Sequence, residues 1–485
     1  MPCTTILAGI KATNDGSTMI ARTEDGGFDI KNFIVVNPKD QKEKYKSAIS
    51  HLEIELPGKP FGYTCTPNVD RKEGIWAAQG INTENVAMSA TETTTSNPRV
   101  LAADPLVAYK PAKGNQKAVP GGIGEEDMVV IVLPYIRSAR EGVKRLGELL
   151  EQYGTYENNG IAFNDAKEAW WFETIGGHHW MARRVPDDQV VIAPNWFSLD
   201  RFDFDDAFGK QKDNMCSADM KEFIEKNHLA LDQGRDFNPR RAFGSHSDND
   251  HIYNTPRAWM MGRCLCPTTY KWDGPNAEFT PESDNIPWCF VPEHKLTIED
   301  VRYILSTHYQ GTPYDPYSNT AEKKGMYRCI GMPRTGTMSI CQIRPYMPKA
   351  LQGVQWVSFG CTTFGAQLPV YTSITKAPRY LSKVTTDFSS ENFYWASRLI
   401  AVLADANFSD NIQPVNRYQS KVANKASRML YEYDAKMQES GKYDLMEEAN
   451  EKMTAMLQEE TTKCINDLLL ADSKCMHNLF NRKDN

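Results

Sequence analysis

The N-terminal end of the chain combines a thiol with two charged groups. Cys3 opens a β-rich run, Thr4–Ala8, which is followed by a turn cluster of Asn, Asp, Gly and Ser. The returning run, Thr18–Thr23, leads into Asp25, so a β-hairpin would bring Arg22 and Asp25 to the end of the hairpin where Cys3 lies. A permanent cation near a cysteine favours the thiolate, which is the nucleophilic form.

This hairpin predicts nucleophilic chemistry if Cys3 becomes the first residue of the working polypeptide. Its own α-amine, with a reference pKa of about 7.7–8, could then serve as the general base, and Asp25 would orient that amine. The alternative is structural: Arg22 and Asp25 form an ordinary ion pair that closes the hairpin. The hairpin residues on their own favour the structural alternative.

Composition describes an ordinary globular protein. The 485 residues are 41% hydrophobic and 24% charged, and the net charge of −7 argues against a nucleic-acid-binding protein. The longest apolar runs, such as Met128–Leu133 and Leu399–Ala404, are far shorter than the ~18–20 residues that span a bilayer. No secretory signal is visible, although a trimmed signal would leave the same sequence. Eleven scattered cysteines favour free thiols in a reducing cytoplasm, so we expect a cytoplasmic protein without a membrane partner.

The pattern along the chain predicts an α+β protein. Residues 125–153 have helical periodicity that Pro134 would interrupt, and short strands are expected at Ile75–Ala78 and Val86–Ala90. Four closely spaced strand-like runs between residues 160 and 193 predict an antiparallel meander, which argues against a Rossmann sheet.

The two ends of the chain differ in character. Residues 1–387 are expected to form a catalytic core with insertions, of which residues 200–300 are long surface connections around short helices. Residues 388–485 are strongly helical and are expected to pack on this core. Because the helical part is long and amphipathic, it offers a surface for self-association, and we expect a homo-oligomer.

An ordered set of motifs resembles the PepD-like dipeptidases, which are cysteine members of the N-terminal-nucleophile (Ntn) hydrolases. The resemblance covers residues 3 to about 470, and no single tetrapeptide within it is specific. The motifs that carry it are Cys3-Thr4-Thr5-Ile6-Leu7, Asp15–Met19, Ala21–Asp25, Gly80-Ile81-Asn82, Ser89–Glu92, Gly177–Trp180, Arg184–Asp188, Tyr253–Arg257 and His308–Asp315.

The resemblance implies a four-layer αββα sandwich of two stacked antiparallel sheets, with the C-terminal helices as an extension. It implies that Cys3 is the nucleophile and that Arg22 and Asp25 flank it. Asn195, which follows the predicted strand Gln189–Ala193, resembles the amide of the oxyanion hole. Arg257 resembles a second arginine near the nucleophile, and its alternative is a surface arginine at a helix start.

Two features depart from the pattern of the related enzymes. Met1-Pro2 precede Cys3, so a free amine on Cys3 requires that both residues are removed. Glu92 falls where the bile-salt acylases carry an asparagine. A dipeptide bears an α-ammonium beside the scissile bond, and a carboxylate such as Glu92 could pair with it. We also expect Asn82 to contact the substrate.

Together these features predict a cysteine-dependent dipeptidase that works through an acyl-enzyme on Cys3, with no metal or organic cofactor. The His and Cys spacings do not match metal sites, and no His-Glu-x-x-His motif occurs. The first alternative is an amidase or acylase of the bile-salt hydrolase or penicillin V acylase type on the same fold. The second is a catalytically silent relative that serves as a binding scaffold. The sequence does not define which dipeptide side chains are preferred.

Overall fold

The core of the protein consists of two antiparallel sheets. The computed structural model describes residues 3–230 and 237–476, without the side chains of Thr91 and Glu92. In spatial order, the seven-stranded sheet contains β14 (Cys289–Phe290), β12 (Val190–Ala193), β1 (Cys3–Ala8), β2 (Thr18–Glu24), β15 (Thr337–Ile343), β16 (Gly353–Phe359) and β17 (Leu368–Tyr371). The six-stranded sheet contains β13 (Asn214–Cys216), β11 (His179–Arg184), β10 (Ala169–Ile175), β9 (Asn159–Asn164), β8 (Ala87–Thr93) and β7 (Gln79–Ile81).

Two small ribbons and thirteen α-helices complete the described part of the chain. The ribbons pair β3 (Ile34–Val36) with β6 (Tyr63–Cys65), and β4 (Lys44–Lys46) with β5 (Glu53–Glu55). The helices are α1 (Pro98–Ala103), α2 (Glu125–Val132), α3 (Ala139–Tyr153), α4 (Phe204–Ala207), α5 (Met220–Lys226), α6 (Pro239–Phe243), α7 (Asp250–Tyr253), α8 (Thr255–Leu265), α9 (Ile298–Ile304), α10 (Arg379–Ser382), α11 (Phe393–Ala406), α12 (Phe408–Ser440) and α13 (Leu445–Lys474). Short 3-10 turns lie at Pro38–Asp40, Leu133–Tyr135 and Lys349–Leu351.

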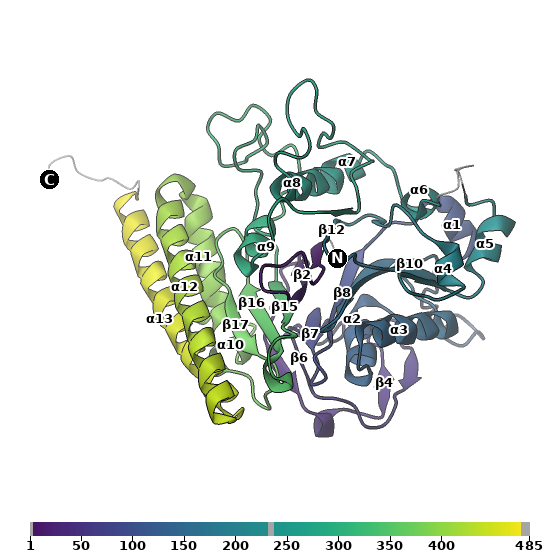
Figure 1. Cartoon of the computed structure of the whole chain (residues 1–485), viewed down its shortest axis with the longest axis horizontal. Helices are drawn as coiled ribbons and strands as arrows, with labels where there is room; N and C mark the ends of the chain where they lie inside the picture. The colour runs from purple at the N-terminus through teal and green to yellow at the C-terminus, as the bar shows by residue number, and fades with distance from the viewer. Residues whose placement is uncertain (1–2, 231–236, 477–485) are drawn as a thin grey trace.

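The sheets stack face to face between two layers of helices. In Figure 1, α11, α12 and α13 cover one side of the seven-stranded sheet, and α2 and α3 cover the far side of the six-stranded sheet. Alternate residues of β1 serve different layers: Ile6 and Ala8 join the core under the helices, whereas Leu7 joins the core between the sheets. This arrangement confirms the expected αββα sandwich.

The N-terminal hairpin forms as predicted and lies inside the larger sheet. β1 pairs antiparallel with β2, and Cys3 lies opposite Glu24 in the register. β12 borders β1 on its other side, and β15 borders β2. Because neighbouring strands hold β1 on both sides, the sheet fixes the position of Cys3.

Two strand predictions are wrong. The expected four-strand meander is split, because β12 leaves β9–β11 and pairs with β1 in the other sheet. Ile75–Ala78 is not a strand, since Trp76 and Ala78 have φ angles of 49° and 59°, in the left-handed region that extended strands do not use.

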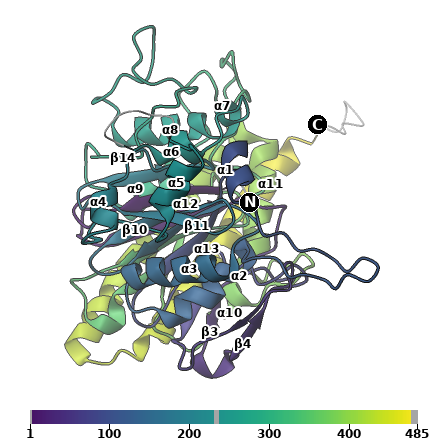
Figure 2. The same ribbon diagram turned by 90° about the vertical axis from the view of Figure 1, so that its right-hand side faces the viewer.

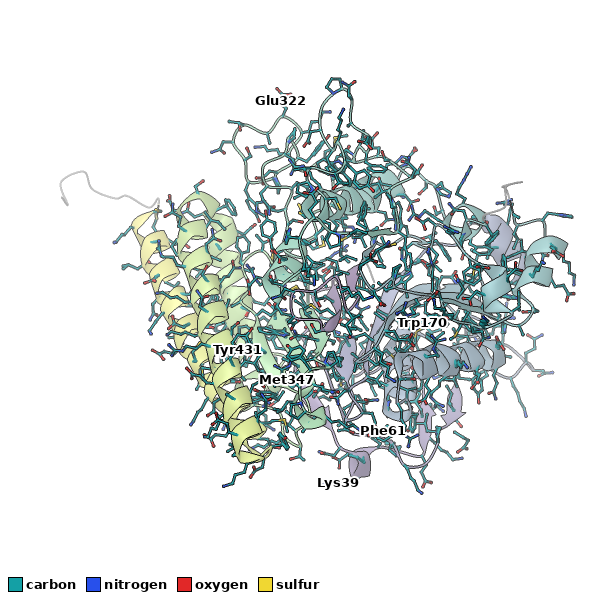
Figure 3. All side chains as sticks on the ribbon, viewed as in Figure 1. Lys39, Phe61, Trp170, Glu322, Met347 and Tyr431 are labelled. Atoms are coloured by element: carbon teal, nitrogen blue, oxygen red, sulfur yellow. The ribbon has the colours of Figure 1, made fainter. Side chains whose placement is uncertain are left out.

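The helical segment after residue 125 divides where the sequence predicted. α2 ends before Pro134, a 3-10 turn follows, and α3 starts at Ala139 with Ser138 as its N-cap. Figure 2 shows α2 and α3 lying over the six-stranded sheet. Trp170, labelled in Figure 3, is fully buried on this sheet, and the guanidinium of Arg140 in α3 lies 4.8 Å from its ring centroid.

The C-terminal helices are held to the larger sheet by a buried ion pair. Arg344, just after β15, donates two hydrogen bonds to the carboxylate of Asp434 in α12, at 2.6 and 3.2 Å. The hydroxyl of Tyr371 donates to the same carboxylate at 2.8 Å.

Among the described helices, none is long and apolar enough to cross a membrane.

An Asp434→Ala substitution is expected to lower the free energy of unfolding by about 3–5 kcal/mol, because it leaves the Arg344 charge buried without its partner. Urea denaturation of both variants would measure the effect. The matched control is Glu432→Ala on the same helix, where the exposed pair with Arg428 spans 3.3 Å and should contribute less than about 0.5 kcal/mol. Equal losses in the two variants would contradict this account.

Candidate active site

Cys3 is fully buried at the first position of β1, and both of its backbone polar groups are held by side chains. Its N–H donates to Asn195 Oδ1 at 2.9 Å. Its carbonyl oxygen accepts a hydrogen bond from Arg257 Nη1. These two partners come from the loop after β12 and from α8, so three separate parts of the chain meet at Cys3.

Arg257 organises this meeting point and is not a surface residue. It is fully buried as the third residue of α8. Besides the Cys3 carbonyl, its Nη1 donates to Thr4 Oγ1 at 2.7 Å, and its Nη2 donates to Asn195 Oδ1 at 2.8 Å and to Asn254 Oδ1 at 2.9 Å. The planar guanidinium thus fixes Cys3 and Asn195 relative to each other. The alternative of a surface arginine at a helix start is wrong.

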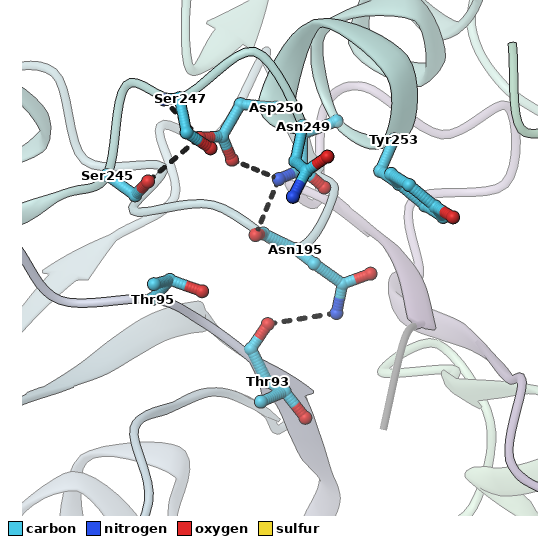
Figure 4. A pocket seen from close by; sticks show the side chains of 9 residues that line it. Thr93, Thr95, Asn195, Ser245, Ser247, Asn249, Asp250 and Tyr253 are labelled. Carbon is cyan, nitrogen blue, oxygen red and sulfur yellow. Dashed lines mark hydrogen bonds between the residues drawn. The ribbon is translucent and has the colours of Figure 1, made fainter.

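Asn195 joins Cys3 to a pocket of about 450 Å³ that it lines together with Thr93, Tyr253 and Asn254. Its Nδ2 donates to the Thr93 carbonyl oxygen at 2.9 Å (Figure 4). Its backbone carbonyl oxygen accepts from Asn254 Nδ2, also at 2.9 Å. Asp250 in turn accepts from Asn254 Nδ2 at 2.6 Å, which fixes the orientation of that amide. The arrangement places a held side-chain amide beside the nucleophile candidate, at the edge of a substrate-sized space.

Arg22 lies in the second strand of the hairpin and is buried. Its Nη2 donates to the carbonyl oxygen of Ala78 at 3.1 Å. The left-handed backbone at Trp76 and Ala78, noted above, turns two carbonyl groups towards cations: the Trp76 oxygen accepts from Lys31 at 3.2 Å. Lys31 also forms a 2.5 Å ion pair with Glu24, the residue opposite Cys3. Strained backbone of this kind is often kept at functional sites.

Asp25 pairs with a residue that the sequence did not indicate. Its carboxylate is fully buried and binds Arg328, and it accepts hydrogen bonds from Thr335 at 2.6 Å and Thr23 at 3.2 Å. The expected local pair with Arg22 is therefore replaced by a long-range pair with Arg328. Nothing in the sequence pattern around Arg328 indicates this contact, because about 300 residues separate the partners.

Burial has a larger effect on the pKa of the Cys3 thiol than Arg22 has. Removal from water raises the pKa of Cys3 to about 12; Arg22 acts in the opposite direction, whereas Glu125 and Asp25 add to the increase. Arg22 favours the thiolate, as expected, but burial has the larger effect on the pKa in the chain in which Pro2 precedes Cys3. The thiol of this form is protonated at neutral pH.

In the chain that keeps residues 1–2, alkylation of Cys3 by iodoacetamide is expected to accelerate about tenfold per pH unit from pH 7 to 10, because only the thiolate reacts. Peptide mapping at several times would measure the rate, with the exposed Cys475 as an internal standard for labelling. A rate that stops rising below pH 9 would contradict the raised pKa.

The two predicted substrate-binding residues have different outcomes. Asn82 follows β7 in the turn that leads into β8, whereas Thr93 ends β8, so about 20 Å separates the two residues at 3.3 Å per residue. Its Nδ2 donates to the carbonyls of Leu133 and Ile136, both at 2.8 Å, and its Oδ1 holds the β7–β8 turn. Asn82 is thus structural and does not reach the pocket. Glu92 belongs to β8, but its side chain lies outside the described part of the structure.

Two further observations concern metal binding and the type of fold around Cys3. Among the residues that the structure describes, no group of three or more His, Cys, Asp or Glu side chains is placed to hold a metal ion. Two stacked antiparallel sheets lie between helices, and Cys3 starts a central strand with Arg257 and Asn195 around it; the fold is the four-layer αββα sandwich expected of the N-terminal-nucleophile hydrolases.

Comparison with known proteins gives the family. A model of peptidase family C69 matches residues 2–421, and the chain belongs to this family. The chain is 54% identical to a dipeptidase from Bifidobacterium longum, over 91% of this chain and 84% of that protein. It is 47% identical to a probable dipeptidase A from Streptococcus pyogenes serotype M3, over the full length of both. A solved structure of a conjugated bile acid hydrolase mutant from Clostridium perfringens aligns with a TM-score of 0.30 and 10% identity, over 74% of this chain and 89% of that one.

Proposed function

We propose that the protein hydrolyses dipeptides through an acyl-enzyme on Cys3. The observation that carries this proposal is the position of Cys3 at the start of a central strand, bound through its backbone by Asn195 and Arg257, in a member of peptidase family C69. The names of the relatives support dipeptides as the substrate class.

The reaction has two halves. The Cys3 sulfur attacks the peptide carbonyl carbon, and the oxyanion that develops on the carbonyl oxygen is stabilised by the Asn195 amide. The C–N bond breaks, the leaving amine takes a proton, and a thioester joins the first amino acid to Cys3. Water then hydrolyses the thioester, which releases the first amino acid and restores the thiol.

The proton acceptor in this scheme is the α-amine of Cys3 after Met1 and Pro2 are removed. A buried thiol with a pKa of about 12 needs a base in contact with it, and an α-amine of reference pKa about 7.7–8 has the strength required near neutral pH. The Asn195 Oδ1 that accepts a hydrogen bond from the Cys3 N–H would then accept one from this amine and orient it. Arg22 and Asp25 support the strand end around it, Arg22 through Ala78 and Asp25 through Arg328.

A panel of dipeptides and N-acylated amides tests this function. We expect kcat/KM for dipeptides to exceed that for conjugated bile acids, penicillin V and N-acyl amino acids by at least about 100-fold, since the free amine distinguishes the substrate classes. Chelation with EDTA should leave the activity intact. A preference for N-acylated amides would assign the protein to the acylase alternative, and activity that EDTA removes and zinc restores would contradict the cysteine mechanism.

Two further expectations concern location and assembly. All eleven cysteines lie in described residues and are free thiols, which is consistent with a reducing cytoplasm. The C-terminal helices expose apolar side chains, among them Val402, Tyr431 and Leu470, and we expect self-association through this surface.

A further inference from the structure

Three consecutive acidic residues open α2 beside the candidate nucleophile, and all three are buried. Glu126 and Asp127 have structural partners, because their carboxylates accept hydrogen bonds from hydroxyl groups at 2.6 to 3.0 Å: those of Ser47, Tyr156 and Tyr45. Asp127 also caps the helix by accepting the N–H of Gly124 at 3.0 Å. The first residue, Glu125, has a different environment.

Glu125 is directed towards the residues around Cys3. Thr93 Oγ1 donates to Glu125 Oε2 at 3.5 Å, and the carbonyl oxygen of the same threonine accepts from Asn195 Nδ2. Asn195 in turn binds the Cys3 N–H. The Glu125 carboxylate is thus linked to Cys3 through two residues, and its charge, after the larger effect of burial, helps to raise the pKa of the thiol.

Two more polar side chains, those of Glu157 and Asn159, lie near Glu125 and Thr93. Glu157 Oε1 accepts the backbone N–H of Glu125 at 2.8 Å. Asn159 lies directly opposite Thr93 in the β8–β9 ladder, and opposite residues of an antiparallel pair direct their side chains to the same face. Asn159 is fully buried, and its side-chain N–H group lies close enough to Glu157 to lower the pKa of that carboxyl. Its Oδ1 has no hydrogen-bond partner among the described residues, and a buried oxygen left unpaired is costly unless a ligand binds it.

We propose that Glu125, Glu157 and Asn159 form the subsite for the α-ammonium group of the substrate. This inference rests on the proposed dipeptide hydrolysis and names the groups that select for it. An ammonium group has three N–H donors, and the two carboxylates and Asn159 Oδ1 supply three acceptors. The α-nitrogen of a dipeptide lies two bonds from the carbonyl carbon under attack, about 2.5 Å away, so a cation subsite has to adjoin the nucleophile.

Electrostatics favour a cation at this subsite. Burial raises the pKa of Glu125 and of Glu157; the Glu157 carboxylate raises the pKa of Glu125 further, and Glu126 does the same to Glu157. A bound ammonium would offset this cost through charge-assisted hydrogen bonds. An N-acylated substrate has no such charge and would leave both carboxylates buried beside a neutral amide, so the subsite rejects it.

The test compares Ala-Ala with N-acetyl-Ala-Ala as substrates of the full chain. Glu125→Gln and Glu157→Gln are each expected to lower kcat/KM for Ala-Ala by about 100-fold, mainly through KM, without lowering the rate on N-acetyl-Ala-Ala. Asn159→Ser, which keeps a small polar side chain, is expected to raise KM for Ala-Ala by about 10-fold. Glu126→Gln is the matched control on the same helix and should keep the parental ratio between the two substrates.

Three outcomes separate this inference from the proposed function. If the parent protein cleaves no dipeptide, the proposed function fails and the subsite fails with it. If the parent cleaves Ala-Ala but the Glu125 and Glu157 variants lose activity equally on both substrates, the subsite is wrong while the proposed function stands. If only Glu92→Gln changes the substrate ratio, Glu92 is the ammonium-binding group and the subsite is again wrong. Labelling of Cys3 to completion by iodoacetamide in each variant would show that the nucleophile is still in place.

Discussion

A Cys3→Ala variant is expected to fold normally and to hydrolyse dipeptides at least about 10⁴-fold more slowly than the parent, because no other group can form the acyl-enzyme. The sulfur is buried in a sheet that holds β1 on both sides, so its loss leaves only a small cavity with a stability cost of about 1 kcal/mol. Initial rates on a dipeptide, with thermal unfolding as the test of folding, would measure both effects.

The matched control is Cys341→Ala. Cys341 is also fully buried in the larger sheet, and burial raises the pKa of its thiol as well, but it pairs with Ile20 in the middle of β2. It should keep nearly parental activity. Cys3→Ser should lose activity as Cys3→Ala does, since a hydroxyl is far harder to ionise than a thiol. If both Cys3 variants cleaved dipeptides at the parental rate, the proposed mechanism would be wrong.

An Asn195→Ala variant is expected to lose about 10²–10³ in kcat with a smaller change in KM, as removal of one oxyanion donor does. The side chain also accepts hydrogen bonds from Cys3 N–H and Arg257 Nη2, so its loss leaves two buried donors without this acceptor. Steady-state kinetics with several dipeptides would separate kcat from KM, and thermal unfolding would report the structural cost.

Asn249→Ala provides the comparison for this effect. Asn249 lines the same pocket, and its side chain makes no capping hydrogen bond to α7. Its substitution should change kcat by less than about threefold, a change of about 0.6 kcal/mol. An Asn195→Ala enzyme whose defect lies wholly in KM would show that Asn195 binds the substrate and does not stabilise the transition state.

The parts of the fold that local patterns encode could be predicted from the sequence. The β1–β2 hairpin follows from two β-rich runs and the turn between them, and the division between α2 and α3 follows from Pro134. The role of Asn195 came from the resemblance to the dipeptidases, and the predicted strand Gln189–Ala193 placed this residue after β12. Long amphipathic segments gave the C-terminal helices α11, α12 and α13.

The remaining features depend on long-range packing. β12 has the length and composition of a meander strand, and only its fit beside β1 places it in the other sheet. The left-handed backbone at Ala78 is held by tertiary contacts, and no local residue type indicates it. Arg328 reaches Asp25 across about 300 residues.

The environment of the thiol is the most instructive difference. The sequence placed a cation near Cys3 but could not give the depth of burial, which outweighs the cation and raises the pKa of the thiol to about 12. Only the folded chain also brings Glu125 close enough to act on Cys3, although the two lie about 120 residues apart. Removal of the residues before Cys3 is therefore central to the proposed mechanism, in which the freed α-amine of Cys3 is the base for the buried thiol.

Intact-mass spectrometry of the active enzyme, before and after inactivation by iodoacetamide, tests most directly whether the working polypeptide begins at Cys3 and depends on its thiol. The account predicts a polypeptide that begins at Cys3, and activity that disappears in proportion to a single added carbamidomethyl group on that residue, with protection by a dipeptide. A preparation that turns over dipeptides at full rate while every molecule retains Met1 and Pro2, or while Cys3 is completely alkylated, would contradict it.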